Sequence, residues 1–109
     1  MKRGDIYLFD LSDSAGHEQS GIRPGILASG LVNGMLLVVP LTTNLESLRF
    51  SHTLSVMPSG GNHLKNESVA LVFHLKSLDR RRATKLIGKI DIQVQKEINR
   101  VMKNLLGLG

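Results

Sequence analysis

Residues 25–41, with the sequence GILASGLVNGMLLVVPL, decide the fold class of this chain. They hold two apolar runs separated by Asn33-Gly34, a dipeptide typical of two-residue hairpin turns because both of its positions tolerate positive φ. Pro40, near the end of the second run, indicates an edge or a strand terminus, since proline has no N–H to donate to a sheet. The sequence therefore predicts an antiparallel β-hairpin.

Further short strands are predicted on both sides of this hairpin. Apolar runs of strand length occupy residues 6–11, 53–56, 68–75 and 86–90. Polar segments rich in turn-forming residues separate them and are expected to be loops, at residues 12–21, 42–49 and 58–66.

The C-terminal segment changes its period. Between residues 94 and 105, apolar side chains recur at helical spacing, with Asp91 as a plausible N-cap and Gly107 as a plausible stop. Short strands followed by one helix predict a mainly β (α+β) class. The expected architecture is a single domain over residues 1–109, a small curved β-barrel with a C-terminal helix.

Composition narrows the function classes. The 109 residues, 41% of them hydrophobic, suffice for one core, and the formal net charge of +5 favours an anionic partner. The chain has no cysteine, which excludes disulfides, thiol nucleophiles and zinc–thiolate sites and fits a reducing cytoplasm. No apolar run approaches the roughly 20 residues of a membrane-spanning helix, so no membrane association is expected.

The segment 16–24, GHEQSGIRP, brings together residue types that can carry out chemistry. His17 can move protons near neutral pH, and Arg23 can hold a phosphate through two hydrogen bonds. Glu18 and Gln19 lie between them. On the residues alone, a solvated polar loop is the more common explanation of such a segment.

Thr42 and Thr43 follow the second hairpin strand. Hydroxyl groups at a strand end can bind a phosphate, although turn formation is the commoner reason for threonine there. Arg80 and Arg81 belong to a basic cluster that also contains Arg82, Lys85 and Lys89. That cluster suits contacts with a nucleic-acid backbone, and equally a solubilising face or a docking site for an acidic protein.

His74 and Lys76 are expected side by side on the non-core face of the strand predicted at residues 68–75. An ordinary exposed pair on a sheet is the alternative. The histidines are widely spaced and lack a carboxylate companion pattern, so no metal site is expected.

Several of these segments resemble the MazF/PemK toxin family, and the similarity covers nearly the whole chain. The first motif is the most specific, and the order and spacing of all of them add weight. The matching segments are RGDIY at 3–7, GHEQSGIRP at 16–24, PLTTN at 40–44, ESVAL at 67–71, SLDRR at 77–81 and the end of the terminal helix.

The resemblance implies a small SH3-like, CcdB-like barrel and a homodimer. It also implies a metal-independent, ribosome-independent and sequence-specific endoribonuclease, the toxin of a type II toxin–antitoxin pair, which needs no cofactor. In the implied reaction the ribose 2′-hydroxyl attacks the adjacent phosphorus of single-stranded RNA. A cyclic phosphate and a 5′-hydroxyl result. The implied partner is an antitoxin whose acidic, apolar, disordered tail blocks the RNA groove.

The same resemblance implies roles for individual residues. Arg23 and Thr42 are the implied catalytic pair, and His17 occupies a position to which one branch of the family assigns acid–base work. Glu18 and Gln19 match motif positions that order the loop or contact RNA. The remaining RNA contacts are expected from Thr43, His74, Lys76, Arg80 and Arg81.

The chain departs from the family pattern at two positions. Phe73 replaces a carboxylate that one branch uses in catalysis, and Lys76 replaces an arginine, with loss of the two-pronged guanidinium. These departures leave two alternatives open: a CcdB-like toxin that poisons DNA gyrase, and a catalytically inactive regulator that binds its antitoxin. Neither would cut RNA.

Overall fold

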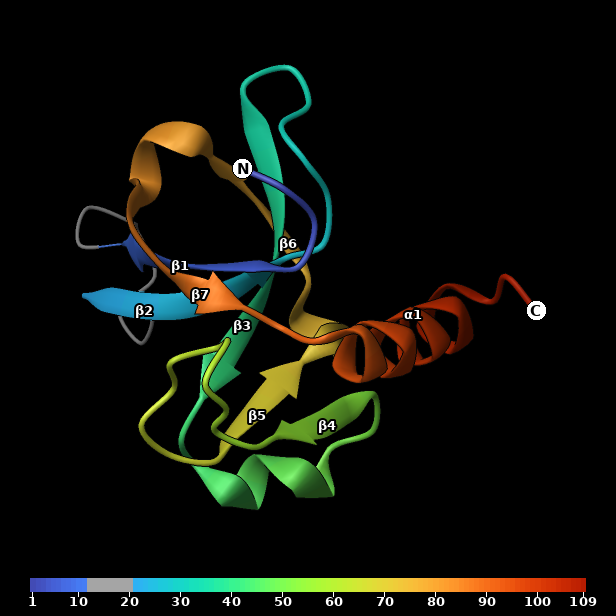
Figure 1. The fold of residues 1–109 in the computed structure, drawn as a ribbon. Coiled ribbons are helices and arrows are strands. Elements are labelled where there is room, and N and C mark those ends of the chain that lie inside the picture. Colours follow the sequence, from blue (N-terminus) through green and yellow to red (C-terminus); the bar gives the residue numbers. More distant parts are fainter. Residues whose placement is uncertain (12–20) are drawn as a thin grey trace.

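The structure, a computed structural model, describes residues 1–11 and 21–109. Seven strands and a C-terminal helix make up most of it (Figure 1). In chain order the elements are β1 (Asp5–Asp10), β2 (Ile22–Leu27), β3 (Met35–Thr42), the 3₁₀ helix η2 (Leu45–Arg49), β4 (Thr53–Val56), β5 (Ser68–Leu71), the 3₁₀ helix η3 (Val72–His74), β6 (Lys76–Asp79), the 3₁₀ helix η4 (Arg80–Arg82), β7 (Ala83–Lys89) and α1 (Ile92–Leu106).

The hairpin predicted around Asn33-Gly34 is confirmed. β2 and β3 pair antiparallel, with Leu27 opposite Val38. The two turn residues have φ values of 51° and 78°, in the left-handed region that the Asn-Gly pair tolerates. The hairpin fixes how the end of β3 sits relative to the beginning of β2.

β3 lies at the centre of the sheet and changes partners along its length. One side pairs with β2, while the other side pairs first with β6 over residues 35–38 and then with β5 through Leu41 and Thr42. Pro40 lies two residues before the strand end, close to the expected terminus. It also lies between the two partner strands, where a missing N–H costs no ladder bond.

The predicted class, mainly β with a C-terminal helix, is confirmed. The main path of pairing runs β4-β5-β3-β2-β1-β7, with β6 attached to β3, so the described strands form a sheet whose pairing does not close into a ring. Asp91 caps α1 by accepting a hydrogen bond of 2.9 Å from the backbone N–H of Val94. Gly107 ends the helix at a φ of 68°, as expected.

Two apolar clusters fill the interior, and β3 separates them. Leu36 and Val38 belong to the smaller cluster, which Phe9 and Leu27 also fill. Val39 and the other face of β3 belong to the larger cluster, into which α1 inserts its buried side chains. Successive side chains of β3 point to opposite faces of the strand, and each face packs into a different apolar cluster.

The prediction of one strand over residues 68–75 is wrong. β5 ends at Leu71, η3 turns the chain, and β6 begins at Lys76. Ala70 and Val72 are fully buried, so the face assigned to solvent is in part core. The bend lets the chain leave β4 and join the other half of β3, a tertiary requirement that an apolar run does not encode.

Smaller differences concern element ends. β7 begins three residues before its predicted start, and the segment 42–49 contains η2 where a loop is expected. In the part of the chain that the structure describes, no helix is both long and apolar enough to cross a membrane.

Candidate active site

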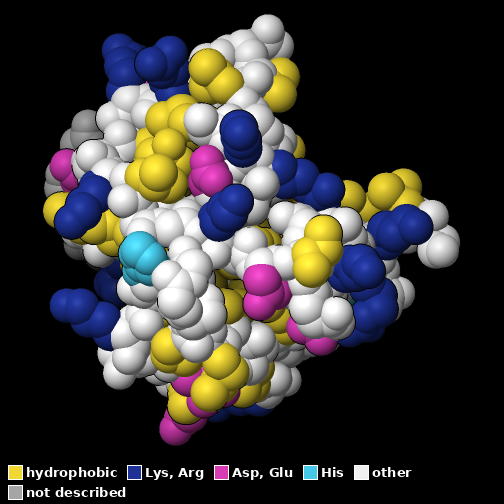
Figure 2. All heavy atoms as spheres, viewed as in Figure 1, with side chains coloured by type: hydrophobic (Ala, Val, Ile, Leu, Met, Phe, Trp, Pro, Cys, Tyr) yellow, Lys and Arg dark blue, Asp and Glu magenta, His cyan; other side chains and the backbone are white. Residues whose placement is uncertain are grey.

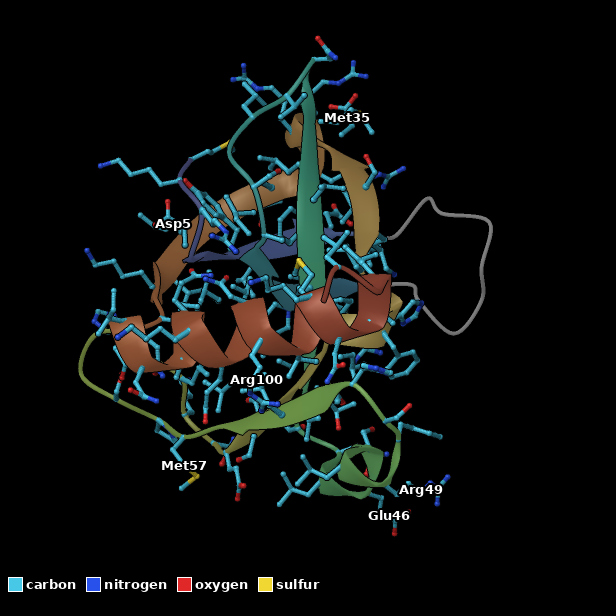
Figure 3. All side chains as sticks on the ribbon, turned by 90° about the vertical axis from the view of Figure 1, so that its right-hand side faces the viewer. Asp5, Met35, Glu46, Arg49, Met57 and Arg100 are labelled. Atoms are coloured by element: carbon cyan, nitrogen blue, oxygen red, sulfur yellow. The ribbon has the colours of Figure 1, made fainter. Side chains whose placement is uncertain are left out.

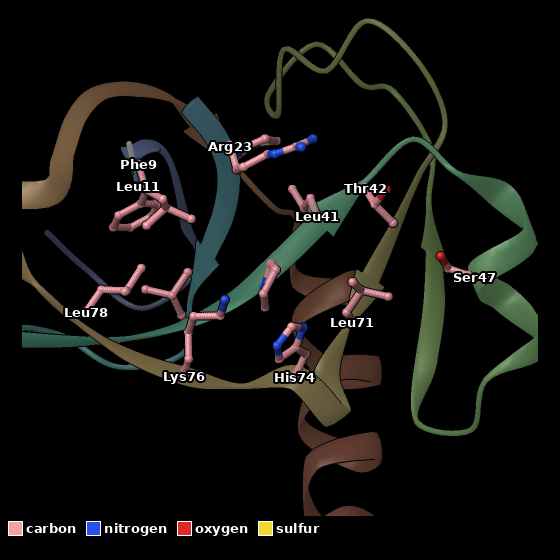
Figure 4. Close-up of a pocket in the computed structure, with 13 residues that line it drawn as sticks. Phe9, Leu11, Arg23, Leu41, Thr42, Ser47, Leu71, His74, Lys76 and Leu78 are labelled. Carbon is pink, nitrogen blue, oxygen red and sulfur yellow. The ribbon is translucent and has the colours of Figure 1, made fainter. Parts of the chain in front are cut away.

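A cavity of about 210 Å³ opens beside the junction of β2, β3 and the β5–β6 bend (Figure 4). Eight of its thirteen lining residues are apolar and five are polar or charged, a mixture common in ligand sites. The lining residues are Phe9, Leu11, Arg23, Pro24, Val38, Pro40, Leu41, Thr42, Ser47, Leu71, His74, Lys76 and Leu78.

Arg23 reaches the cavity from β2. It pairs with Phe9 across the β1–β2 ladder, which fixes its backbone, and its side chain is exposed. Figure 4 shows the guanidinium extending toward the end of β3 that carries Thr42. An exposed guanidinium that lines a cavity is suited to an oxyanion ligand.

Thr42 is the last residue of β3 and is half-buried. Its Oγ1 accepts a hydrogen bond of 3.2 Å from the backbone N–H of Asn44, which orients the hydroxyl while leaving its own proton available for donation. Asn44 in turn caps η2, and Ser47 of that helix also lines the cavity. Local turn chemistry therefore holds the hydroxyl in place.

His74 and Lys76 reach the cavity from the β5–β6 bend and lie together in Figure 4. Burial, with a smaller contribution from the Lys76 charge, lowers the pKa of His74 below its usual 6.5. Burial also lowers the pKa of Lys76. The imidazole is therefore mainly neutral at pH 7, and the ammonium gives up its proton more readily than a surface lysine.

Among the described residues, the charged side chains that line the cavity are basic. Arg23 and Lys76 supply positive charge, and the lining residues in the described ranges 1–11 and 21–109 include no carboxylate. Positive charge around a partly apolar cavity favours a phosphodiester ligand over a cationic one. Figure 2 shows further basic side chains gathered over α1, an element that contributes no residue to the cavity lining.

Four of the residues singled out from the sequence meet in this cavity: Arg23, Thr42, His74 and Lys76. Thr43 directly follows Thr42 in the chain, but its side chain is exposed and does not line the cavity. His17, Glu18 and Gln19 lie outside the described residues.

Arg80 and Arg81 do not line the cavity, although Leu78, two residues before Arg80, does, and both arginines lie far from Thr42. The backbone N–H of Arg80 donates to Gly34 at the hairpin tip, next to Met35. From Met35 to Thr42, β3 spans seven residue steps, or about 23 Å. In Figure 3, Met35 lies at one end of the molecule and η2, marked by Glu46 and Arg49, lies at the other. Arg81 is also held by Asp79, at 3.1 Å.

Two features of the site, a serine in the lining and a ring-stacking contact, were not predicted from the sequence. Ser47 lines the cavity only because η2 turns it inward, and the one available signal was the Asn44 cap with Glu46 two residues later. The second is the stacking of His74 on Phe73, with ring centroids 5.9 Å apart and planes inclined by 13°. The described residues contain no cluster of three or more potential metal ligands among His, Asp and Glu.

Comparison with protein families gives a match over residues 2–106 to PemK-like, MazF-like toxins of type II toxin–antitoxin systems. Among curated relatives, Endoribonuclease MazF of Staphylococcus saprophyticus is 29% identical, covering 99% of this chain and 92% of the relative. Endoribonuclease EndoA of Bacillus subtilis is 23% identical, covering 99% of this chain and 96% of the relative.

Solved structures give a consistent result. MazE–MazF (Form-II) from Deinococcus radiodurans superposes with a TM-score of 0.77 at 25% identity, over 100% of this chain and 97% of the other. MazF (Form-I) from the same organism gives a TM-score of 0.76 at 27% identity, over 98% and 96%. An endoribonuclease in complex with its cognate antitoxin, from a mycobacterial species, shares the fold at 20% identity, over 100% and 97%, with a TM-score of 0.75.

Proposed function

Because this chain belongs to the family of PemK-like, MazF-like toxins of type II toxin–antitoxin systems, we propose that it is an endoribonuclease that cuts single-stranded RNA at specific sequences. Growth arrest of the cell follows from loss of its messages. The proposed place of action is the cytoplasm.

The proposed reaction uses the RNA's own nucleophile. The ribose 2′-oxygen attacks the adjacent phosphorus, and the 5′-oxygen leaves, which gives a 2′,3′-cyclic phosphate and a 5′-hydroxyl. Charge builds up on the phosphoryl oxygens in the transition state and is best stabilised by donors that are already in position. Arg23 supplies charge and two donors, and Thr42 supplies a hydroxyl donor.

The observation that carries the proposal is the shared cavity of Arg23 and Thr42. The two side chains come from different strands, and the β2–β3 hairpin brings them to one opening. A single phosphodiester bound there contacts both at once. His17, assigned from the sequence to proton transfer, stays part of the proposal.

RNA beyond the scissile phosphate is proposed to follow the positive rim. His74 and Lys76 line the same cavity, and Thr43 adjoins it. Glu18 and Gln19 remain proposed contacts from the sequence. Arg80 and Arg81 follow the lining residue Leu78, and they are proposed to contact RNA that runs from the phosphate site along β3 toward the hairpin tip.

The proposed partner is a cognate antitoxin. The similar Deinococcus radiodurans structure is a MazE–MazF complex. For this chain, an acidic and apolar disordered tail fits a partly apolar cavity that Arg23 and Lys76 line, and it would inhibit by occupying the place of the RNA. A homodimer is proposed by analogy with the family.

The test is to incubate purified protein with a long unstructured RNA, map the cut sites and identify the ends. Cleavage to cyclic phosphate and 5′-hydroxyl ends, lost in Arg23→Ala but kept in the surface variant Arg100→Gln, is the expected result. Intact RNA together with inhibition of DNA gyrase would point instead to a gyrase poison. Intact RNA with antitoxin binding only would point to an inactive regulator. Either result overturns the proposal.

A further inference from the structure

We propose that His74 is the general base of the reaction, and that it takes the proton of the attacking 2′-hydroxyl. This assignment rests on the proposed function and adds a catalytic role to a residue that the sequence analysis assigned only to RNA contact.

The first step is the chemistry of the cavity lining. A base must be unprotonated near neutral pH and must face the phosphate site. The titratable side chains that line the cavity in the described residues are Arg23, His74 and Lys76, and no carboxylate is among them. His74 is the lining group that can accept a proton.

The second step is the protonation state of His74. Burial, and then the Lys76 charge, lowers the pKa of His74, which keeps it neutral and ready to accept a proton at pH 7. Among the described neighbouring elements, η2 carries Glu46, which lies 3.9 Å from Arg49, and α1 carries Glu97 together with basic side chains. β3 and β4 contain no charged residue, and α1 contributes buried apolar side chains to the cluster that holds Val72. Across the cavity, Arg23 is a further cation.

The third step is how the ring is held. η3 turns the chain at Val72, and its last residue, His74, projects into the cavity. The ring stacks on Phe73, which packs against Phe50 with centroids 5.8 Å apart. The backbone N–H of Phe73 donates a hydrogen bond of 3.2 Å to the backbone carbonyl of His52. Phe73, at the position where many relatives have a carboxylate, therefore acts as a platform for its neighbour.

The proton balance involves two groups, His74 and Lys76, and this assignment takes the place of the proton-transfer role that the sequence analysis gave to His17. The 2′-hydroxyl proton passes to an imidazole nitrogen of His74 as the O2′–P bond forms. The P–O5′ bond breaks, its electron pair stays on the 5′-oxygen, and that oxygen takes a proton from the Lys76 ammonium. Proton exchange with water returns both side chains to their starting states.

The decisive measurement is single-turnover cleavage of a short RNA that contains one mapped site, between pH 5 and 9. Wild-type cleavage should fall as pH drops through the His74 pKa, below 6.5, because the protonated ring cannot accept a proton. His74→Gln should lose about 10²- to 10⁴-fold in rate and lose this acid limb. His63→Asn, a change of an exposed histidine outside the cavity at a φ of 55°, should match the wild type.

Two further readouts separate catalysis from positioning. Affinity of His74→Gln for an uncleavable RNA with a 2′-deoxy nucleotide at the cut site should stay within about threefold of the wild type. Free imidazole should restore cleavage to His74→Ala. An RNA with sulfur in place of the leaving 5′-oxygen needs no proton donor, so it should rescue Lys76→Ala but leave His74→Gln impaired.

The possible failures are distinguishable. If the wild type cuts RNA and Arg23→Ala does not, while His74→Gln keeps its rate and its acid limb, the His74 assignment is wrong and the proposed function stands. If the wild type leaves RNA intact, the proposed function itself fails. Should His74→Gln not fold, a wild-type rate that is flat between pH 5 and 7 would also overturn the assignment.

Discussion

The salt dependence of RNA binding offers a quantitative test of the cavity. Two of its lining residues, Arg23 and Lys76, are cations. For single-stranded nucleic acid, each neutralised phosphate contributes about 0.7 to the slope of log K against log salt. The double variant Arg23→Gln/Lys76→Gln should therefore lose about 1.4 from the wild-type slope. Between 50 and 200 mM salt, a fourfold change, its affinity should fall about sevenfold less than that of the wild type.

The assay is fluorescence anisotropy with a labelled RNA that carries a 2′-deoxy nucleotide at the mapped cut site, so that no cleavage occurs. The matched control is Arg100→Gln, on α1 and outside the cavity, which removes one cation but should keep the wild-type slope. If the slope of the double variant is unchanged, or if the slope of the control falls by as much as that of the double variant, the RNA does not bind at the cavity.

Three other predictions concern single side chains. Thr42→Val should lower the cleavage rate by about 10²- to 10³-fold, because it removes one preorganised hydrogen-bond donor, whereas Thr42→Ser should retain most of the rate. Equal single-turnover rates for the two variants would contradict a catalytic role for the Thr42 hydroxyl. Asp91→Ala should lower the free energy of unfolding in urea by about 1 kcal/mol through loss of the α1 cap, and an unchanged midpoint would contradict this. The hydrogen bonds from Arg81 lower the pKa of Asp79 to about 2, so this carboxylate stabilises the fold above about pH 4, and the contribution is lost as pH falls toward 2. Asp79→Asn should remove that acid-dependent part of the unfolding curve, and identical wild-type and variant profiles would refute it.

The sequence predicts the fold best where the signals are local. Asn33-Gly34 dictates a turn, Asp91 caps a helix and Gly107 ends it, each through the conformation or hydrogen bonding of a few consecutive residues. The β5–β6 bend was missed for the opposite reason. Val72 and its neighbours are as apolar as any strand, and only pairing with both halves of β3 makes the chain turn there.

The site was predictable in its parts and only partly in its arrangement. Arg23 and Thr42 carry a guanidinium and a hydroxyl, groups that can bind a phosphate, and the predicted hairpin brings their strands together. His74 was placed beside Lys76 by alternation along a strand, but η3 is what directs it into the cavity. Its stacking on Phe73 depends on a tertiary contact with Phe50, which residue spacing does not reveal.

The central claim is that the 2′-oxygen of the RNA cuts its own phosphodiester in the cavity of Arg23 and Thr42. The most direct measurement compares two RNAs that differ only in the hydroxyl next to the mapped scissile phosphate. The all-ribose strand should be cut to a cyclic phosphate, and the strand with one 2′-deoxy nucleotide should stay intact at that position. Cleavage of the deoxy strand at the same phosphate would contradict the account, because a nucleophile other than the 2′-oxygen would then have attacked the phosphorus.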